Sequence, residues 1–239
     1  MSEYIFGKNT VTAYLKSGQK PKNVYLFNKG SYPEIVAIAK EKNINVQFVD
    51  KFRLDKMVKG VHQGAVIEIQ DYRYADIETI VENAKHKLIV VCDQLEDPHN
   101  LGAILRSSDA AGVDGVVIGK HRSVSLTATV AKVSTGAINT VPVAQVTNLV
   151  QTVQYLKQQG YWVVAAENAV DAVSYDQFNV DMPIALVVGS EGKGISRLMK
   201  KECDILTTIP MFGTVNSLNV SVATGILLFE IVRRRNLLK

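Results

Sequence analysis

Cysteine is scarce in this chain of 239 residues, which carries only Cys92 and Cys203. Neither stands at a spacing typical of a zinc site or a redox pair, and the four histidines are scattered, so we expect free thiols and no metal. No apolar run approaches the roughly 18 residues that span a bilayer, and the first residues lack the basic and apolar stretches of a leader. The sequence therefore favours a cytoplasmic protein with no membrane partner.

Charge is unevenly distributed, although the formal net charge is only +4. Residues 1–75 hold twelve lysines and arginines against seven acidic residues, whereas residues 76–239 hold fifteen against sixteen. A basic first third is compatible with a polyanionic partner such as RNA, but solvated surface lysines are the commoner explanation. Charge alone leaves this choice open.

The amino-terminal part alternates short β-rich runs, at 23–27, 44–49 and 64–69, with amphipathic segments. This alternation predicts a small α/β unit, which we place at residues 1–71. Residues 72–86 are polar with flanking aromatic residues, and we expect a linker that ends in a short helix.

From residue 87 to residue 239, nearly continuous apolar runs alternate with helical stretches. This pattern is typical of a parallel sheet covered by helices on both faces. Ligands bind beyond the carboxyl ends of the strands in such sheets, so the polar segments that follow three of the strands form the candidate site. The expected strands are 88–92, 115–119, 141–146, 161–166, 184–189 and 204–209.

The first polar segment is DQLEDPHNLGAILRSSDAAG. Asp97 and Pro98 predict a turn, and Asn100 is a favourable N-cap for the helix that follows. Arg106 is unusual there, because the helix is otherwise small and apolar and an unpaired guanidinium is costly to bury. Two roles stay open for Arg106: it extends to solvent, or it faces an anionic or developing-oxyanion site.

The second segment, GSEGKGIS, is a glycine-rich turn after a strand and would offer backbone N–H groups to a ligand. It departs from the phosphate-binding loop, since Ile195 stands where lysine is required and Glu191 would repel phosphate. A neutral or cationic ligand suits this turn better than a triphosphate. A nucleotide-binding enzyme that uses this loop for phosphate is therefore disfavoured.

The third segment, PMFGTVNSLNVSVA at 210–223, crowds glycine and short polar side chains in front of an apolar helix. One serine or asparagine would be enough to cap that helix. Thr214, Asn216, Ser217 and Asn219 exceed that need, so we expect them to line a site.

The three polar segments, in the order in which they occur along the chain, resemble the three motifs of the SpoU, or TrmH-like, RNA 2′-O-ribose methyltransferases. The first module, with YIFGKNTVTAYL and VHQGAVIEI, also resembles the small RNA-binding domain of the branch that methylates a guanosine of 23S rRNA. The catalytic resemblance extends over residues 87–239 and rests on LVVGSEGKGIS, on IPMFGTVNSLNVSVA, and on Asp93, Asp97, Pro98, Asn100, Gly102, Ala103, Ile104 and Arg106.

The resemblance implies an α/β fold of the SPOUT type, with a parallel sheet and a deep carboxyl-terminal trefoil knot, preceded by a small α/β RNA-binding domain. It further implies a homodimer that uses S-adenosylmethionine to methylate RNA, with no DNA partner. The positions that match the family's cofactor site are Gly189, Ile209, Met211, Gly213 and Leu218, and the matching catalytic positions are Asn100, Arg106, Glu191, Ser217 and Asn219.

Arg106 matches a residue with a central role when the ribose 2′-hydroxyl attacks the methyl group. Because a guanidinium stays protonated in proteins, we favour stabilisation of the alkoxide or clamping of a phosphate over a role as base. Glu191 is expected to orient Arg106, and Asn219 to both cap a helix and position the nucleotide. Two alternatives stay open, a tRNA 2′-O-methyltransferase and a non-catalytic RNA-binding assembly factor with the same fold.

Overall fold

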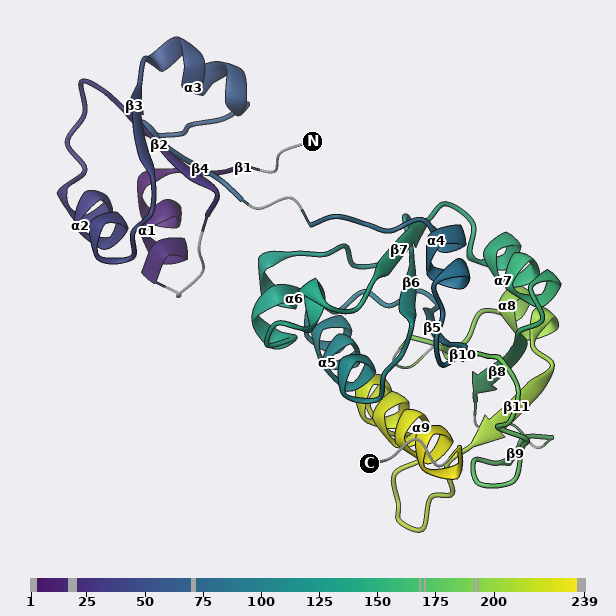
Figure 1. Cartoon of the computed structure of the whole chain (residues 1–239). Coiled ribbons are helices and arrows are strands. Elements are labelled where there is room, and N and C mark those ends of the chain that lie inside the picture. The colour runs from purple at the N-terminus through teal and green to yellow at the C-terminus, as the bar shows by residue number, and fades with distance from the viewer. Residues whose placement is uncertain are drawn as a thin grey trace. The chain divides into compact units, whose positions relative to one another are not determined.

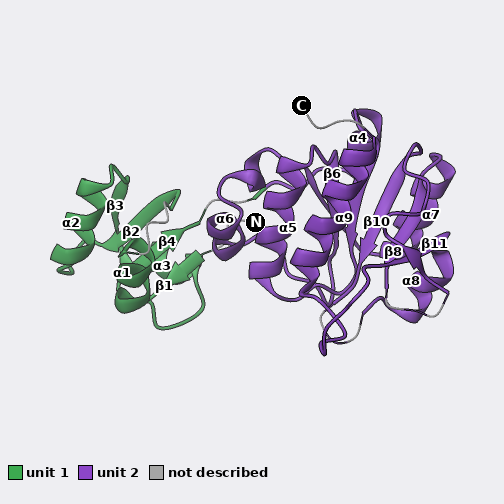
Figure 2. Cartoon of the chain, turned by 90° about the horizontal axis from the view of Figure 1, so that it is seen from below, with its two compact units in different colours: residues 1–72 green, residues 73–239 purple. Residues whose placement is uncertain are grey.

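The chain folds into two compact units, Met1–Tyr72 and Arg73–Lys239, which Figure 2 draws in different colours. The linker expected at 72–86 falls almost entirely within the second unit. Its helix α4 (Ile77–Glu82) buries two isoleucines in the core of that unit, which explains the difference. The computed structural model describes residues 4–16, 21–69, 72–167, 169, 171–190, 192 and 194–235.

The first unit is the small α/β domain that the sequence predicted. Its four-stranded sheet has the order β1-β4-β2-β3, in which β2 and β3 are parallel and the other pairs antiparallel. Helices α1 and α2 pack against one face and α3 against the other (Figure 1). The elements are β1 (Tyr4–Phe6), α1 (Lys8–Lys16), β2 (Asn23–Phe27), α2 (Pro33–Glu41), β3 (Val46–Val49), α3 (Lys51–Met57) and β4 (Ala65–Glu68).

The described part of the second unit forms a seven-stranded sheet in the order β7-β6-β5-β10-β8-β11-β9, with every pair parallel. This confirms the predicted parallel sheet. All six expected strands are present, and only the two-residue strand β9 was not predicted. The strands are β5 (Leu88–Cys92), β6 (Gly115–Gly119), β7 (Val143–Val146), β8 (Trp162–Ala166), β9 (Val173–Ser174), β10 (Ile184–Val188) and β11 (Ile205–Thr208).

Helices cover both faces of this sheet, which explains why its central strands are apolar at every position. Helices α4, α7 and α8 bury side chains in the core on one face, and α5 packs on α9 over the other (Figures 1 and 2). The trefoil knot stays a prediction. The remaining helices are α5 (Pro98–Ala110), α6 (Ala128–Val133), the 3₁₀ helix η1 (Ala137–Asn139), α7 (Leu149–Gln158), α8 (Arg197–Glu202) and α9 (Val220–Arg234).

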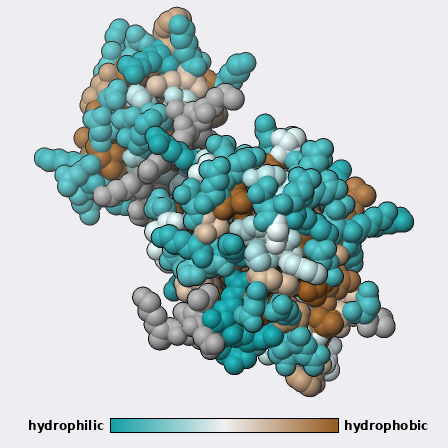
Figure 3. All heavy atoms as spheres, turned by 45° about the vertical axis from the view of Figure 1, so that its right-hand side comes forward, coloured by the Kyte–Doolittle hydropathy of each residue, from teal (hydrophilic) through white to brown (hydrophobic). Residues whose placement is uncertain are grey.

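The surface view in Figure 3 shows a face on which hydrophilic side chains predominate and hydrophobic atoms form separate patches. Within the described residues, no helix combines the length and apolar character needed to cross a membrane.

Candidate functional site

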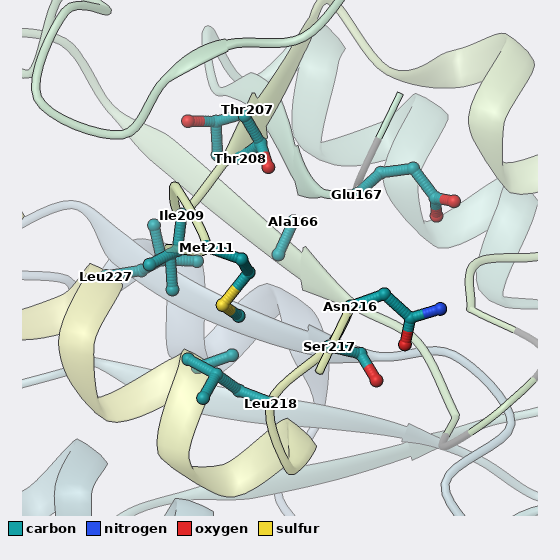
Figure 4. Close-up of a pocket in the computed structure, with 11 residues that line it drawn as sticks. Ala166, Glu167, Thr207, Thr208, Ile209, Met211, Asn216, Ser217, Leu218 and Leu227 are labelled. Atoms are coloured by element: carbon teal, nitrogen blue, oxygen red, sulfur yellow. The ribbon is translucent and has the colours of Figure 1, made fainter. Parts of the chain in front are cut away.

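Two adjoining cavities lie beyond the carboxyl ends of β8, β10 and β11. The larger, about 820 Å³, is bounded by the glycine-rich turn after β10. The smaller, about 140 Å³, is shown in Figure 4, where the side chains of Met211 and Leu218 approach one another and Glu167 and Asn216 lie to one side. The two cavities share Ala166, Glu167, Asn216, Ser217, Leu218 and Ala223.

The glycine-rich turn is held in shape by its own backbone. Ser190 and Gly194 exchange backbone hydrogen bonds of 3.1 and 2.9 Å, which closes the turn into a small loop. A Cβ atom at Gly189 would lie 2.2 Å from the carbonyl carbon of Gly194, so only glycine fits there. Gly192 and Gly194 have φ angles of +80° and +63°, which side chains disfavour. The glycines are therefore required by the loop itself.

Two carboxylates fasten the end of this loop to the sheet. The Asp93 Oδ2 atom, which follows β5, accepts a hydrogen bond of 2.7 Å from the backbone N–H of Ser196. The Glu167 carboxylate, which follows β8, accepts one of 3.3 Å from the N–H of Ile195 and one of 2.9 Å from Lys200 Nζ. Asp93 belongs to the predicted motif, whereas Glu167 was not predicted. The available signal was its place directly after an apolar strand.

Helix α5 begins one turn earlier than predicted. Its N-cap is Asp97, whose carboxylate accepts a hydrogen bond of 2.8 Å from the His99 N–H, and Pro98 takes the first helical position. The expectation that Asn100 is the N-cap was therefore wrong. Proline suits the first turn because its missing N–H would have no helical partner there. This places Asn100 inside the helix, where its side chain is buried.

Asn100 and Asn219 join the first and third polar segments. The Asn219 Nδ2 atom donates a hydrogen bond of 3.0 Å to Asn100 Oδ1. The Oδ1 atom of the same Asn219 accepts from the N–H groups of Ser221 and Val222, at 2.9 and 3.4 Å, and so caps α9. One side chain thus starts α9 and ties it to α5.

Arg106 is exposed on α5. Because its guanidinium is not buried, the cost of desolvating an unpaired charge does not arise. Within the described part of the chain, Arg106 forms no ion pair. Glu191, expected to orient Arg106, lies outside the described residues. The guanidinium is thus accessible to a ligand at the surface of α5.

The other predicted site residues divide between the two cavities. Gly189 and Asn219 line the larger cavity, whereas Ile209 and Met211 line the smaller. Ser217 and Leu218 line both. Gly213 lines neither, and a Cβ atom there would meet nothing within 4 Å.

The cysteine thiols do not supply a nucleophile to the site. Burial, reinforced by the charge of Asp93, raises the pKa of Cys92 to about 12. Burial likewise raises the pKa of Cys203 to about 12, with the charge of Asp204 adding to the effect. Both thiols are free, as predicted, and both stay protonated near neutral pH.

Comparison with known proteins accounts for both units. Residues 87–229 match the model of the SpoU rRNA Methylase family, which spans more than half of the chain. The chain belongs to this family. It is an RNA methyltransferase, and its residues 4–75 match the model described as RNA 2′-O ribose methyltransferase substrate binding. The enzyme thus joins a substrate-binding unit to a catalytic unit.

Relatives match the enzyme along nearly its full length. A Bacillus subtilis protein described as a TrmH family tRNA/rRNA methyltransferase is 46% identical over 98% of this chain and 96% of its own. An AdoMet-bound rRNA methyltransferase from Sinorhizobium meliloti has a TM-score of 0.65 and 26% identity, and covers 100% of this chain and 88% of its own. At 20% identity, AviRb from Streptomyces viridochromogenes shares the fold, with a TM-score of 0.66 over 98% of this chain and 91% of its own.

Proposed function

We propose that the enzyme transfers a methyl group from S-adenosylmethionine to a ribose 2′-hydroxyl of RNA, and that its target is a guanosine of 23S rRNA. The observation that carries the proposal is the hydrogen bond between Asn219 and Asn100. It brings the polar residues of the first and third segments together beside the cavity that the second, glycine-rich segment bounds. The substrate-binding model that matches the first unit supports the 2′-O position.

The larger cavity fits the cofactor. S-adenosylmethionine carries its reactive methyl group on a positively charged sulfonium. A cavity of about 820 Å³ lies within the range of small-molecule sites, and its wall combines the backbone of the glycine-rich loop with the carboxylate of Glu167 and the apolar side chain of Leu218. These groups suit a cationic ligand with a polar ring system. AdoMet occupies the related Sinorhizobium meliloti enzyme.

The protein's own contribution to the reaction is positioning and charge stabilisation. The ribose oxygen must be held in line with the methyl group, which converts an encounter into an oriented step. Asn100 and Asn219 hold α5 against the start of α9, and α5 presents Arg106. The Arg106 guanidinium stabilises the negative charge that develops on the 2′-oxygen, or holds the neighbouring phosphate. Ser217 lines both cavities and would donate a hydrogen bond to a bound nucleotide there.

The proposal includes a homodimer that works in the cytoplasm and has the trefoil knot of SPOUT enzymes. Support for the dimer comes from α9, where Val222, Ile226 and Phe229 are 50%, 36% and 41% exposed. Their spacing places them along one side of the helix. An apolar helix stripe of this kind is typical of a surface covered by a partner.

The target is tested by methylation with S-adenosylmethionine labelled in its methyl group. The enzyme is incubated separately with 23S rRNA and with tRNA, and the products are hydrolysed in alkali. Alkaline cleavage needs a free 2′-hydroxyl, so 2′-O-methylation leaves the label in alkali-resistant dinucleotides. We expect resistant label in rRNA, on the guanosine at the 5′ side of the alkali-resistant dinucleotide. Label released in mononucleotides contradicts the 2′-O position, and labelling of tRNA alone contradicts the rRNA target.

Calorimetry with S-adenosylmethionine and with ATP separates the remaining alternatives. We expect S-adenosylmethionine to bind and ATP not to bind. Binding of ATP alone indicates a nucleotide-binding enzyme, and the absence of both cofactor binding and methyl transfer indicates a non-catalytic assembly factor.

A further inference from the structure

Helix α3 of the first unit presents an aromatic ring and several cations to solvent. The Phe52 side chain is 67% exposed, although burial of a phenylalanine ring is strongly stabilising. The Lys56 Nζ atom lies over the Phe52 ring, 4.5 Å from its centroid. The ring and the ammonium group therefore form one surface feature, in which the cation is held against the ring face.

This face is strongly basic. Lys51, Arg53, Lys56 and Lys59 are all exposed within nine residues of sequence, and none of them forms an ion pair within the described part of the chain. Arg53 lies against the ring of Tyr25. The cations therefore dominate the charge that α3 presents.

The two nearby carboxylates, Asp50 and Asp55, offset only part of this charge, because they stand against four cations. Asp50 caps α3 and accepts a hydrogen bond of 2.8 Å from the Arg53 N–H. Asp55 is bound to the Nε2 atom of the buried His62 at 2.9 Å. An anionic partner would thus meet an excess of positive charge.

We propose that the α3 face, defined as Lys51, Phe52 and Lys56 of the helix together with Lys59 two residues beyond its end, binds a single-stranded segment of the RNA substrate. One unpaired base stacks on the face of the Phe52 ring opposite Lys56, and the lysines neutralise the flanking phosphates. A duplex hides the faces of its bases, whereas an unpaired base offers its face to an aromatic ring. The inference rests on RNA being the substrate and adds to it the surface of contact and the strandedness.

The opposite side of the same unit offers a matched control. Phe48 of β3 is 58% exposed, nearly as much as Phe52. Val46, two residues earlier on the strand, packs in the core formed with α1 and α2, so alternation places Phe48 on that face of the sheet. Lys29 and Lys40 are exposed outside α3. Substitutions at these positions therefore remove the same kinds of side chain, an exposed phenylalanine and exposed lysines, while leaving the α3 face intact. The controls are Phe48, Lys29 and Lys40.

The experiment measures binding of the full chain to a fluorescein-labelled, unstructured 12-nucleotide RNA and to the same RNA paired with its complement. We expect Phe52→Ala to weaken single-strand binding about tenfold, Phe52→Trp to retain it, and Phe48→Ala to leave it unchanged. Duplex binding changes little in Phe52→Ala, because the stacked base is absent there.

Salt dependence tests the phosphate contacts. We expect the triple variant Lys51→Gln, Lys56→Gln, Lys59→Gln to lower the slope of log affinity against log salt by about 2 for single strands. The double variant Lys29→Gln, Lys40→Gln keeps the wild-type slope. Thermal melting of each variant checks that the unit stays folded.

The proposal is overturned if folded Phe52→Ala binds single-stranded RNA like the wild type, or if Phe48→Ala is equally impaired. Equal loss of duplex and single-strand binding also overturns it. These results leave cofactor binding and methyl transfer by the wild-type enzyme untouched, so they are distinguishable from a failure of the proposed function. A wild-type enzyme that binds no S-adenosylmethionine contradicts the function instead.

Discussion

Asn219 donates a hydrogen bond to Asn100 across 119 residues of sequence, while the same side chain caps α9. Asn219→Ala removes both interactions, so we expect the free energy of unfolding to fall by about 2 kcal/mol. Asn219→Ser retains a capping oxygen but does not reach Asn100, and should recover roughly half of that loss. Urea denaturation measures both. Equal stabilities of the alanine and serine variants would show that the cap contributes nothing.

Gly189 and Gly213 should respond differently to the same substitution. A Cβ atom at Gly189 collides with the backbone of Gly194, whereas at Gly213 it meets open space. Gly189→Ala should therefore distort the glycine-rich loop and reduce S-adenosylmethionine binding at least tenfold, and Gly213→Ala should bind normally. Calorimetry on the two folded variants makes the comparison. Normal S-adenosylmethionine binding by Gly189→Ala would mean that cofactor binding does not depend on the shape of this loop.

The two cysteines should be unreactive in the folded protein. Since burial raises both pKa values to about 12, both thiols stay almost entirely protonated at pH 8. Ellman's reagent should react slowly with the folded chain and rapidly with both thiols in guanidinium. Two fast thiols in the folded protein would contradict the burial.

The raised thiol pKa values also predict how stability changes in alkali. Unfolded thiols lose their protons near pH 8.5, below the folded pKa of about 12, so the unfolded state binds fewer protons between these values. Stability should consequently decrease as the pH rises through this range. Replacing both Cys92 and Cys203 by alanine should flatten that part of the pH profile, as measured by urea denaturation.

The exposed stripe on α9 should hold the proposed dimer together. Phe229→Glu places a charge in the stripe, so we expect the protein to change from dimer to monomer in analytical ultracentrifugation. Phe48→Glu, which alters an equally apolar residue of the first unit, should leave the mass unchanged. A wild-type monomer at micromolar concentration would refute the dimer, as would a Phe229→Glu variant that stays dimeric.

Much of the fold could be predicted from the sequence because its signals are local and strong. Strands such as β5 and β10 are apolar at every position since both faces of the sheet are covered, and this feature is legible without the structure. The short strand β9 carries only two residues and no periodic pattern. The role of α4 also escaped prediction, because whether two isoleucines join a core depends on what lies opposite them.

The candidate site was predictable in its segments and less so in its contacts. The polar residues after the strands correctly indicated which edge of the sheet carries the site. Asn100 was predicted to be the N-cap of α5, but Asp97 takes that position. Glu167 contacts Ile195 and Lys200, which lie about 30 residues away in sequence, and no local pattern announces such a contact. Contacts of this kind depend on how the strands are ordered in the sheet, which a local sequence pattern does not reveal.

The central claim is that Arg106 stabilises charge on the attacking ribose oxygen, and single-turnover methylation with pre-bound RNA and S-adenosylmethionine tests it most directly. We expect Arg106→Ala to reduce the rate of the chemical step about 100-fold or more, while cofactor affinity stays close to that of the wild type. Arg106→Lys should recover little, because it keeps the charge without the planar fork. A rate near that of the wild type for Arg106→Ala would show that Arg106 is a solvent-exposed arginine with no part in the reaction.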